Sequence, residues 1–374
     1  MIRYLTAGES HGEALITIVD SFPSGIELNE GDIDTELHRR QGGYGRSRRM
    51  KIEKDSAKVL SGTRGGKTTG SPITIIISNK DWKNWKEEEK ITAPRPGHAD
   101  LSGAIKYGEA DLRNVSERAS ARETAARTAV GALAKTLLRE FGISVLSHVI
   151  SIGGVRARAA KVTPEKIIEA QKRALLSCID PAAEELMIAE IDKAAAKGDS
   201  LGGVFEIIVR GVPIGLGSYA HWDRRLDGRL SQAVMSIQAI KGVEIGLGFD
   251  AARKVGSKVH DEIFYNKHSF YRKTNNAGGI EGGVTNGEQI IIRAAMKPIP
   301  TLQTPLKTVD IITKKTVTAT KERADVCAVP AASVVGEAVI AIEIARAMQD
   351  KFGGDALGEM KRNYVSYQDY IREL

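Results

Sequence analysis

The sequence predicts an α+β fold, and two observations support this prediction. Segments typical of strands and segments typical of helices occur throughout the chain, but they do not alternate regularly as in a protein with a parallel sheet. One helical segment, residues 120–141, has apolar or small side chains on several sides, which indicates a helix at the centre of the molecule. The chain has 374 residues, 42 % of them hydrophobic and 27 % charged, so it is long enough for one large domain or two ordinary ones.

The central helix is predicted from apolar side chains at helical spacing, namely Ala126, Val130, Leu133, Leu137 and Phe141. Its other faces carry the small residues Ala125, Ala129, Gly131 and Ala132. A surface helix would have charged residues on those faces, so this pattern favours burial on more than one side. Gly142 is expected to end the helix.

Further helices are expected at 30–41, 164–176, 181–197, 224–241 and 333–352. Two of them begin with proline at the first helical position, after Thr163 and Asp180 as caps. Runs typical of strands lie at 13–20, 58–62, 73–78, 144–153, 203–210, 288–296 and 307–312.

One short pattern occurs twice. The segments VDSFPSGI (19–26) and VRGVPIGL (209–216) share Val, Pro and Gly at the same spacing, and each follows a strand-like run. They suggest two related halves, although Pro-x-Gly is also common turn chemistry and the match could arise by chance.

The net charge of +7 indicates an anionic partner. The densest basic segment is RRQGGYGRSRRMK (39–51), which holds six Arg and Lys residues. It fits a solvated surface loop, a nucleic-acid contact, or a clamp for an anionic small molecule. Aromatic residues make up only 5 % of the chain and do not interleave with basic ones as in single-strand-binding proteins.

Spacing argues against several other classes of protein. GTRGGKTTG (62–70) looks like a P-loop, but Ser61 stands where that motif needs its first glycine, and a strand rather than a helix is expected next. No G-x-G-x-x-G segment joins a strand to a helix, so a Rossmann site is not predicted. The seven histidines and two cysteines lack the spacing of a ligand set, so no bound metal is expected. Without a signal peptide, an apolar run of about 18 residues or a disulfide pattern, the chain is expected to be cytoplasmic and not to contact a membrane.

Polar side chains gather in loops rich in glycine and proline. His11 lies in TAGESHG (6–12) and His98 in PRPGHAD (94–100), each beside a glycine. Other polar segments are NVSERASARET (114–124), at the start of the central helix, NNAGGIEGGVTNG (275–287), KPIPT (297–301) and KERADVC (321–327). Two histidines in tight turns, together with several arginines, predict acid–base chemistry on a polyanion.

Nine segments, in order along nearly the whole chain, resemble those of chorismate synthases. They are GESHG, RRQGGYGR, GKTTGSPI, RPGHADL, SARET, GVPIGLG, MSIQAIKGVEIGLGF, NNAGGIEGGVTNG and KPIPT. The sequence departs from the family pattern at Ala119–Ser120, where the family often has two serines.

The resemblance implies a fold in which β-sheets sandwich a helical core, with residues 1–374 as one catalytic domain in a homotetramer. It implies an anti 1,4-elimination that converts 5-enolpyruvylshikimate 3-phosphate to chorismate and phosphate, in the biosynthesis of aromatic amino acids. The family requires reduced FMN, although the reaction has no net redox change. Some members reduce the flavin with NAD(P)H themselves, and others depend on an external reductant. The lack of a dinucleotide motif favours an external flavin reductase here, with NADPH as an indirect reductant.

The resemblance also implies roles for individual residues. His11 would protonate the departing phosphate, and His98 would keep reduced FMN in its working protonation state. Asp325 would take part in removing a flavin proton, with Ser10 and Ser120 as relay partners.

Two binding sets follow from the same motifs. Substrate contacts would come from Arg40, Arg46, Arg49, Arg122 and Arg323, and the family positions that match Arg40 and Arg46 are sometimes assigned to NADP instead. FMN contacts would come from Arg118, Ala119, Ser120, Gln238, Ala239, Gly282, Lys297, Pro298, Ile299, Pro300, Thr301 and Arg323.

Two other classes remain open at this point. A nucleic-acid-binding protein could use the basic segment 39–51, and its binding would weaken steeply with salt. A flavin-binding scaffold without turnover is the second alternative, although the presence of His11 and Asp325 argues against it.

Overall fold

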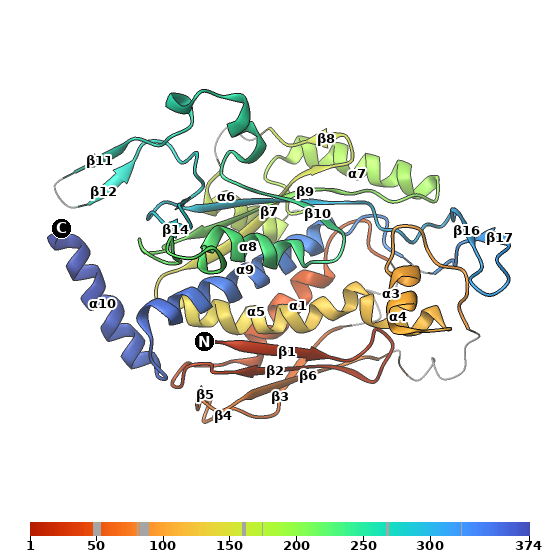
Figure 1. Cartoon of the computed structure of the whole chain (residues 1–374), viewed down its shortest axis with the longest axis horizontal. Helices are drawn as coiled ribbons and strands as arrows, with labels where there is room; N and C mark the ends of the chain where they lie inside the picture. The colour runs from red at the N-terminus through yellow and green to blue at the C-terminus, as the bar shows by residue number, and fades with distance from the viewer. Residues whose placement is uncertain are drawn as a thin grey trace.

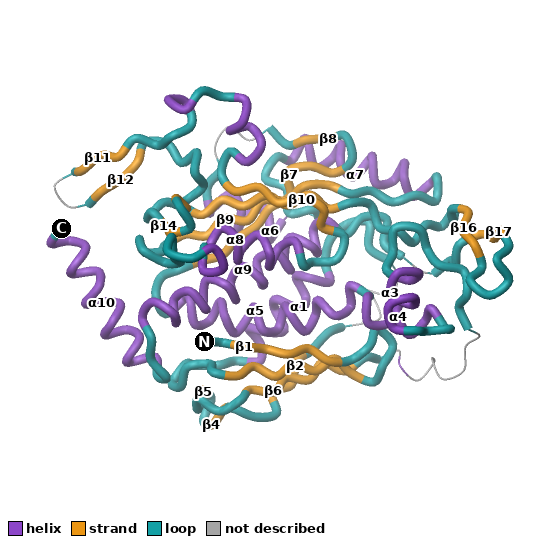
Figure 2. Tube along the Cα trace, viewed as in Figure 1, coloured by secondary structure: helices purple, strands orange, loops and turns teal. Residues whose placement is uncertain are grey.

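The computed structural model describes residues 1–47, 54–80, 82, 90–158, 162–173, 175–266, 269–322 and 324–374. Two antiparallel sheets lie on either side of a layer of long helices (Figures 1 and 2). The first sheet has the strand order β1 (Arg3–Ala7), β2 (Ala14–Asp20), β6 (Ile73–Ser78), β3 (Ala57–Val59). The second has the order β10 (Ile240–Ile245), β15 (Ile290–Met296), β9 (Gly203–Arg210), β7 (Ser144–Ile152), β8 (Val155–Arg156).

The helices between and around the sheets are α1 (Glu30–Gln41), α3 (Asp100–Tyr107), α4 (Leu112–Ala119), α5 (Thr124–Arg139), α6 (Pro164–Arg173), α7 (Pro181–Ala196), α8 (Leu226–Met235), α9 (Val329–Phe352) and α10 (Leu357–Glu373). Short 3-10 helices are η2 (Ala121–Glu123), η3 (Trp222–Arg224), η4 (Gly248–Arg253) and η5 (Gly256–Lys258). Small hairpins are formed by β4 (Thr63–Arg64) with β5 (Lys67–Thr68), β11 (Ile263–Tyr265) with β12 (Phe270–Arg272), β13 (Ile280–Glu281) with β14 (Val284–Thr285), and β16 (Lys307–Val309) with β17 (Thr316–Thr318). No helix in these described ranges is long and apolar enough to cross a bilayer.

Helices α5 and α9 form the centre of the molecule, as expected for residues 120–141 (Figure 1). Helix α5 packs against the first sheet and α9 against strands β7 and β9 of the second. The two helices touch at Gly131, where an added Cβ would lie 2.3 Å from the Cβ of Ala338. Glycine is therefore required at this position because any side chain would push the helices apart.

The repeated turn of the sequence is also repeated in the structure. In the segment 19–26, Thr68 of β5 donates its hydroxyl hydrogen to the proline carbonyl at 2.7 Å and accepts the N–H of the last turn residue at 3.0 Å. In the segment 209–216, Thr285 of β14 makes the same two contacts, at 2.6 and 2.8 Å. The shared spacing is thus a structural repeat, not a coincidence of turn chemistry.

The two halves correspond element by element. Strands β1, β2, β6 and β3 with helices α1 and α5 have the same order and pairing as β7, β9, β15 and β10 with α8 and α9. The segment 62–70, which looks like a P-loop in the sequence, matches GIEGGVTNG (279–287), and each forms a small hairpin before an inner strand. Both glycine-rich segments are therefore turns of the fold.

Some predicted elements have different ends. The helix expected at 224–241 stops at Met235, and residues 240–245 form β10 instead. The break comes where Ala239 adopts a left-handed conformation, with φ of 67°. The helix expected at 333–352 begins earlier, at Val329, and the strands expected at 58–62 and 307–312 end at Val59 and Val309. Strand β1 and helices α3, α4 and α10 were not predicted.

Candidate active site

A cavity of about 870 Å³ opens at one end of the helical layer. Its wall combines both halves of the repeat, with Arg40 from the end of α1, Thr124 from the start of α5, Gln238 from the segment after α8, and Ala332 from the first turn of α9. The N-terminal ends of both central helices therefore face this space. The positive ends of their helix dipoles favour negative charge there.

Most of the residues expected from the sequence line this cavity. They are Ser10, His11, Arg40, Arg46, His98, Ala119, Ser120, Arg122, Gln238, Ala239, Lys297, Ile299, Pro300, Thr301 and Asp325. These residues come from segments spread over more than 300 positions of the chain, so the fold brings together what the motifs showed only separately.

Five expected residues are placed differently or not described. Arg118 is not part of the cavity wall and donates to backbone carbonyls at the end of β1 and just after it. Pro298 is exposed beside the wall, and Gly282 lies in the exposed turn between β13 and β14. Arg49 and Arg323 lie outside the described residues.

The loop that carries His11 is held by polar contacts. Both oxygens of Glu117 on α4 accept from His11, one from its backbone N–H at 2.7 Å and the other from ring Nδ1 at 2.9 Å. Gly8 has φ of 102°, and an added Cβ there would lie 2.3 Å from the carbonyl oxygen of Ala14. Asn79, which follows β6, donates to the carbonyl of Gly12 at 2.7 Å. The glycines let this loop fold tightly enough for Glu117 and Asn79 to reach its backbone.

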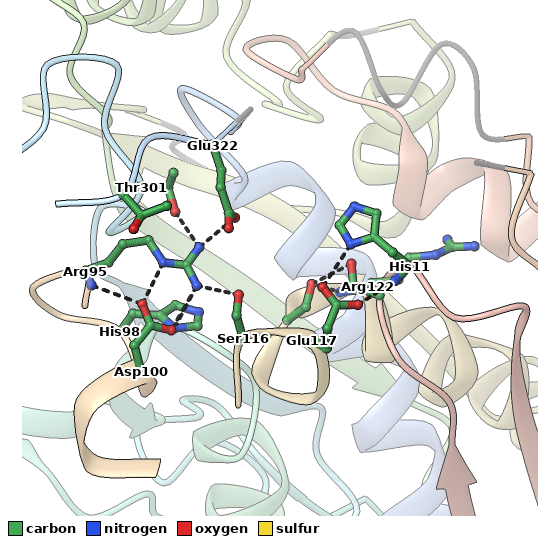
Figure 3. A network of polar contacts seen from close by, with 12 residues as sticks. His11, Arg95, His98, Asp100, Ser116, Glu117, Arg122, Thr301 and Glu322 are labelled. Carbon is green, nitrogen blue, oxygen red and sulfur yellow. Dashed lines mark hydrogen bonds and ion pairs between the residues drawn. The ribbon is translucent and has the colours of Figure 1, made fainter. Parts of the chain in front are cut away.

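His98 is oriented by a buried ion pair (Figure 3). Its Nδ1 lies 2.5 Å from Asp100, whose two oxygens also accept from the Arg95 guanidinium at 2.8 and 2.9 Å. Burial alone would raise the pKa of Asp100, but the hydrogen bonds from Arg95 and His98 outweigh it and hold that pKa well below its usual range. Asp100 therefore stays ionised and keeps the proton of the ring on Nδ1.

Helix α4 connects the two histidines. Ser116 accepts a hydrogen bond of 2.6 Å from Arg95, which lies beside His98, while the next residue, Glu117, holds His11. Figure 3 shows the two clusters on either side of this short helix, with Arg95 also reaching Thr301 and Glu322. Helix α4 therefore contacts His11 directly and is linked to His98 through Arg95.

Two buried arginines share one carboxylate. Asp55 accepts from Arg122 at 2.6 Å and from Arg40 at 3.4 Å, and all three side chains are at most 5 % exposed. Burial lowers the pKa of Arg40 to about 9, although the Asp55 carboxylate opposes this shift. Asn79 accepts two further hydrogen bonds from Arg122. This cluster holds positive charge at the cavity wall without exposing it to bulk water.

Arg46 and Asp325 form a second charged pair on the wall. Nη1 of Arg46 lies 2.8 Å from Asp325, which also accepts the backbone N–H of Ser47 at 2.6 Å. The Nε of Arg46 is buried and has no hydrogen-bond partner within the described ranges. Arg39 turns into the core and pairs with Glu337 at 2.8 Å. Three basic residues of the segment 39–51 therefore point inward, which disfavours a nucleic-acid patch.

Another part of the wall suits a flat, partly apolar ligand. It includes the apolar side chains Ile237, Met296, Ile299, Pro300, Ala331, Ala332 and Val335. Among the residues that the structure describes, the Oε1 atom of Gln238 is buried without a hydrogen-bond partner, and the next residue, Ala239, has the left-handed φ given above. An unpaired acceptor and a strained backbone at a cavity wall are typical of a ligand site. Lys297 adds a positive charge next to them.

Several site residues were missed by the sequence analysis, namely Asp55, Asn79, Arg95, Asp100 and Glu117. Three of them, Arg95, Asp100 and Glu117, stand within the motifs quoted for His98 and for the start of the central helix. A search for a carboxylate or cation near each motif histidine would have found Asp100. Nothing in the sequence connects Glu117 to His11, which lies 106 positions away.

The fold and the cavity together define a class of protein. Two histidine–carboxylate pairs beside buried arginines, in a cavity large enough for a small ligand, make an enzyme site for proton transfer on a polyanionic small molecule. Within the described part of the chain, no cluster of three or more His, Cys, Asp or Glu side chains could hold a metal ion.

Comparison with known proteins agrees with this class and narrows it. The family model described as chorismate synthase matches residues 2–349. Chorismate synthase from Geobacter sulfurreducens is 57 % identical over 391 residues, and that from Desulforamulus reducens is 57 % identical over 387 residues, with 100 % of both chains covered in each case. A crystal structure of chorismate synthase matches with a TM-score of 0.83 and 46 % identity, covering 100 % of this chain and 99 % of that one.

The chain belongs to the chorismate synthase family. The resemblance found in the sequence, the α+β fold and the function as a lyase of the shikimate pathway are confirmed by these matches. The family uses reduced FMN and acts on a phosphorylated small molecule.

Proposed function

We propose that the cavity binds 5-enolpyruvylshikimate 3-phosphate and that His11 donates a proton to the departing phosphate. The observation that supports this role is the contact between His11 and Glu117, which directs ring Nδ1 away from the ligand and compensates positive charge on the ring. In the reaction the bond between carbon 3 and the phosphate oxygen breaks, a hydrogen leaves carbon 6, and the double bond shifts to give the second alkene of chorismate. A positioned general acid typically contributes about 100- to 10,000-fold to such a step.

The arginines bind the negative groups of the substrate in this proposal. Arg40 and Arg122 are fixed by Asp55, and Arg46 is fixed by Asp325, so their donors need little reorganisation when phosphate charge develops. The buried Nε–H of Arg46 is a donor available to a carboxylate or phosphate. The alternative that Arg40 and Arg46 bind NADP rests on the family resemblance alone.

FMN would lie against the apolar wall, with Gln238, Ala239 and Lys297 as its nearest polar contacts. The chemistry that reduced FMN supplies when bound is electron density for the departing phosphate and acceptance of the hydrogen from carbon 6. The residues there fit the group, since Gln238 offers an unpaired acceptor and Lys297 a cation. Arg118, Pro298 and Gly282 are not on this wall, which leaves their expected flavin contacts without support from the cavity.

We assign the roles of proton donor and acceptor near the flavin to His98 and Asp325. The pairing of His98 Nδ1 with Asp100 leaves Nε2 as the ring atom for a ligand. Asp325 is oriented by two N–H donors, from Arg46 and Ser47, which fix its carboxylate at the cavity wall. Ser10 and Ser120 lie 3.2 Å apart, hydroxyl to hydroxyl, as a short relay requires.

The remaining features are proposed from the sequence. Residues 1–374 would act as one catalytic domain, assembled as a homotetramer in the cytoplasm. The absence of a dinucleotide-binding motif in the sequence supports an external flavin reductase, with NADPH only as an indirect electron source.

Anaerobic phosphate release tests the proposal. With dithionite-reduced FMN the protein should release phosphate and form chorismate, and with oxidised FMN plus NADPH it should not. Turnover in both arms would assign a reductase activity to the chain itself. Flavin binding without turnover in either arm would support the scaffold alternative and refute the proposed function.

A further inference from the structure

We propose that Glu117 is the residue that positions His11 for proton transfer, and that it acts on the reaction only through His11. This inference rests on the proposed role of His11 as the acid. Glu117 lines the same cavity, and we class it as a positioning residue because both of its carboxylate oxygens are taken up by His11.

The carboxylate of Glu117 contacts His11 at two points. Oε2 accepts the backbone N–H of His11 at 2.7 Å and Oε1 meets ring Nδ1 at 2.9 Å, so one carboxylate sets both the position of the residue and the rotation of its ring. An ionised carboxylate can only accept, so Nδ1 must carry a hydrogen, and proton transfer to the substrate would use Nε2. Glu117 is 8 % exposed, which shields its carboxylate from water.

The loop depends on these hydrogen bonds with Glu117 because it has no hydrophobic side chain that could pack into the core. Residues 8–13 read GESHGE and contain no hydrophobic side chain. The backbone carbonyl of Glu117 also accepts the N–H of Ser10 at 3.2 Å, so one helical residue holds two successive loop residues. Because Glu117 sits on α4 next to Ser116, its hydrogen bonds with His11 fix this histidine to the helix.

Glutamine in place of Glu117 is the informative change. Its amide has one acceptor oxygen and one donor nitrogen, so it cannot accept from the backbone N–H and from Nδ1–H on separate oxygens as the carboxylate does. Either the ring adopts the neutral tautomer in which Nδ1 accepts from the amide N–H, or the backbone N–H of His11 loses its acceptor. Both outcomes weaken Nε2–H as a donor without removing any group that binds the substrate.

Glu184 provides a matched control. It lies on α7, is 6 % exposed, and accepts the backbone N–H of Leu176 at 2.7 Å. Glu184→Gln removes a buried carboxylate with a similar backbone contact, but on a residue outside the cavity wall. A general loss of stability from neutralising a buried glutamate should therefore appear equally in both variants.

The experiment is a double-mutant cycle measured by anaerobic phosphate release with dithionite-reduced FMN. We expect Glu117→Gln to lower kcat by about 10- to 100-fold, part of the contribution of a general acid, with little change in KM. In the His11→Ala background the same substitution should change kcat by less than about twofold, because two groups that act as a unit are not additive. Glu184→Gln should retain the wild-type kcat.

Several results would overturn the inference. They are a wild-type kcat in Glu117→Gln, a loss confined to KM, or a full multiplicative loss in the double variant. If Glu117→Gln does not fold, Glu117→Asp enters the same cycle and should lose less than His11→Ala, again without a further loss in combination. A wild-type rate in His11→Ala would refute the proposed acid itself, which separates that failure from an error about Glu117 alone.

Discussion

Replacement of Asp55 by asparagine should lower the free energy of unfolding. It should also increase the stabilisation that a bound anion gives to the folded protein. The Asp55 carboxylate is fully buried between Arg122 at 2.6 Å and Arg40 at 3.4 Å, and those side chains are only 4 and 5 % exposed. Removing one partner of a buried ion pair costs about 3–5 kcal/mol, because it leaves an uncompensated charge. Asparagine keeps one acceptor oxygen, so we expect the lower end, about 3 kcal/mol, or roughly a 100-fold lower ratio of folded to unfolded protein.

A substrate phosphate can replace the missing negative charge. A ligand that binds only the folded state stabilises it by RT ln(1 + [L]/Kd). Because the arginines of Asp55→Asn lack their carboxylate, their affinity for the anion should rise, and 5-enolpyruvylshikimate 3-phosphate should stabilise the variant more than the wild type. The buried arginines then act as an anion site that Asp55 partly neutralises at rest.

Urea denaturation with and without the substrate measures both effects. The control is Asp34→Asn, which removes a carboxylate that holds the same segment through Ser56 and Ala57 rather than through a cation. A free energy of unfolding equal to that of the control, or a smaller gain from substrate than in the wild type, would refute the charge-compensation role of Asp55.

Three further predictions concern the cavity wall. Arg46→Lys should weaken substrate binding and slow turnover, since a lysine cannot hold Asp325 and a ligand with separate planar donors, and a lysine variant with wild-type kinetics would reduce Arg46 to a general positive charge. Asp100→Asn should lower the free energy of unfolding by an amount that is constant from about pH 8 to pH 5. Because the folded-state pKa of Asp100 is depressed, its contribution is lost only as pH falls below the unfolded-state value of about 4, and a difference that changes between pH 8 and pH 5 would contradict this account. Calorimetric titration should show that FMN binds more tightly with substrate present, because both sets of proposed contacts line one cavity, and equal affinities would argue against a shared site.

The sequence was most informative where periodicity and turn chemistry agree with the fold. The apolar side chains at helical spacing in 120–141, with small residues on the other faces, predicted a central helix. Small residues let neighbouring helices approach closely, as Gly131 does at Ala338. The repeated turn predicted two related halves, although the matching glycine hairpins at 62–70 and 279–287 were not recognised as part of that repeat.

Contacts between distant segments were beyond sequence reasoning. The bond between Glu117 and His11 and the shared carboxylate of Asp55 depend on how α4, η2 and the segment before β3 pack, which no local pattern encodes. The helix expected at 224–241 was too long because its apolar spacing continues past Met235, while the left-handed Ala239 is fixed by tertiary contacts such as the hydrogen bond from Lys297.

The most direct test of His11 as the acid is the rate of phosphate release by His11→Ala under anaerobic conditions with saturating reduced FMN, compared with its affinity for FMN. The structure places His11 at the cavity wall with its ring paired to Glu117, and none of the contacts proposed for the flavin comes from His11. We predict a fall in turnover of about 100- to 10,000-fold with FMN affinity nearly unchanged. A variant that keeps most of its rate, or one that instead loses FMN, would contradict the assignment.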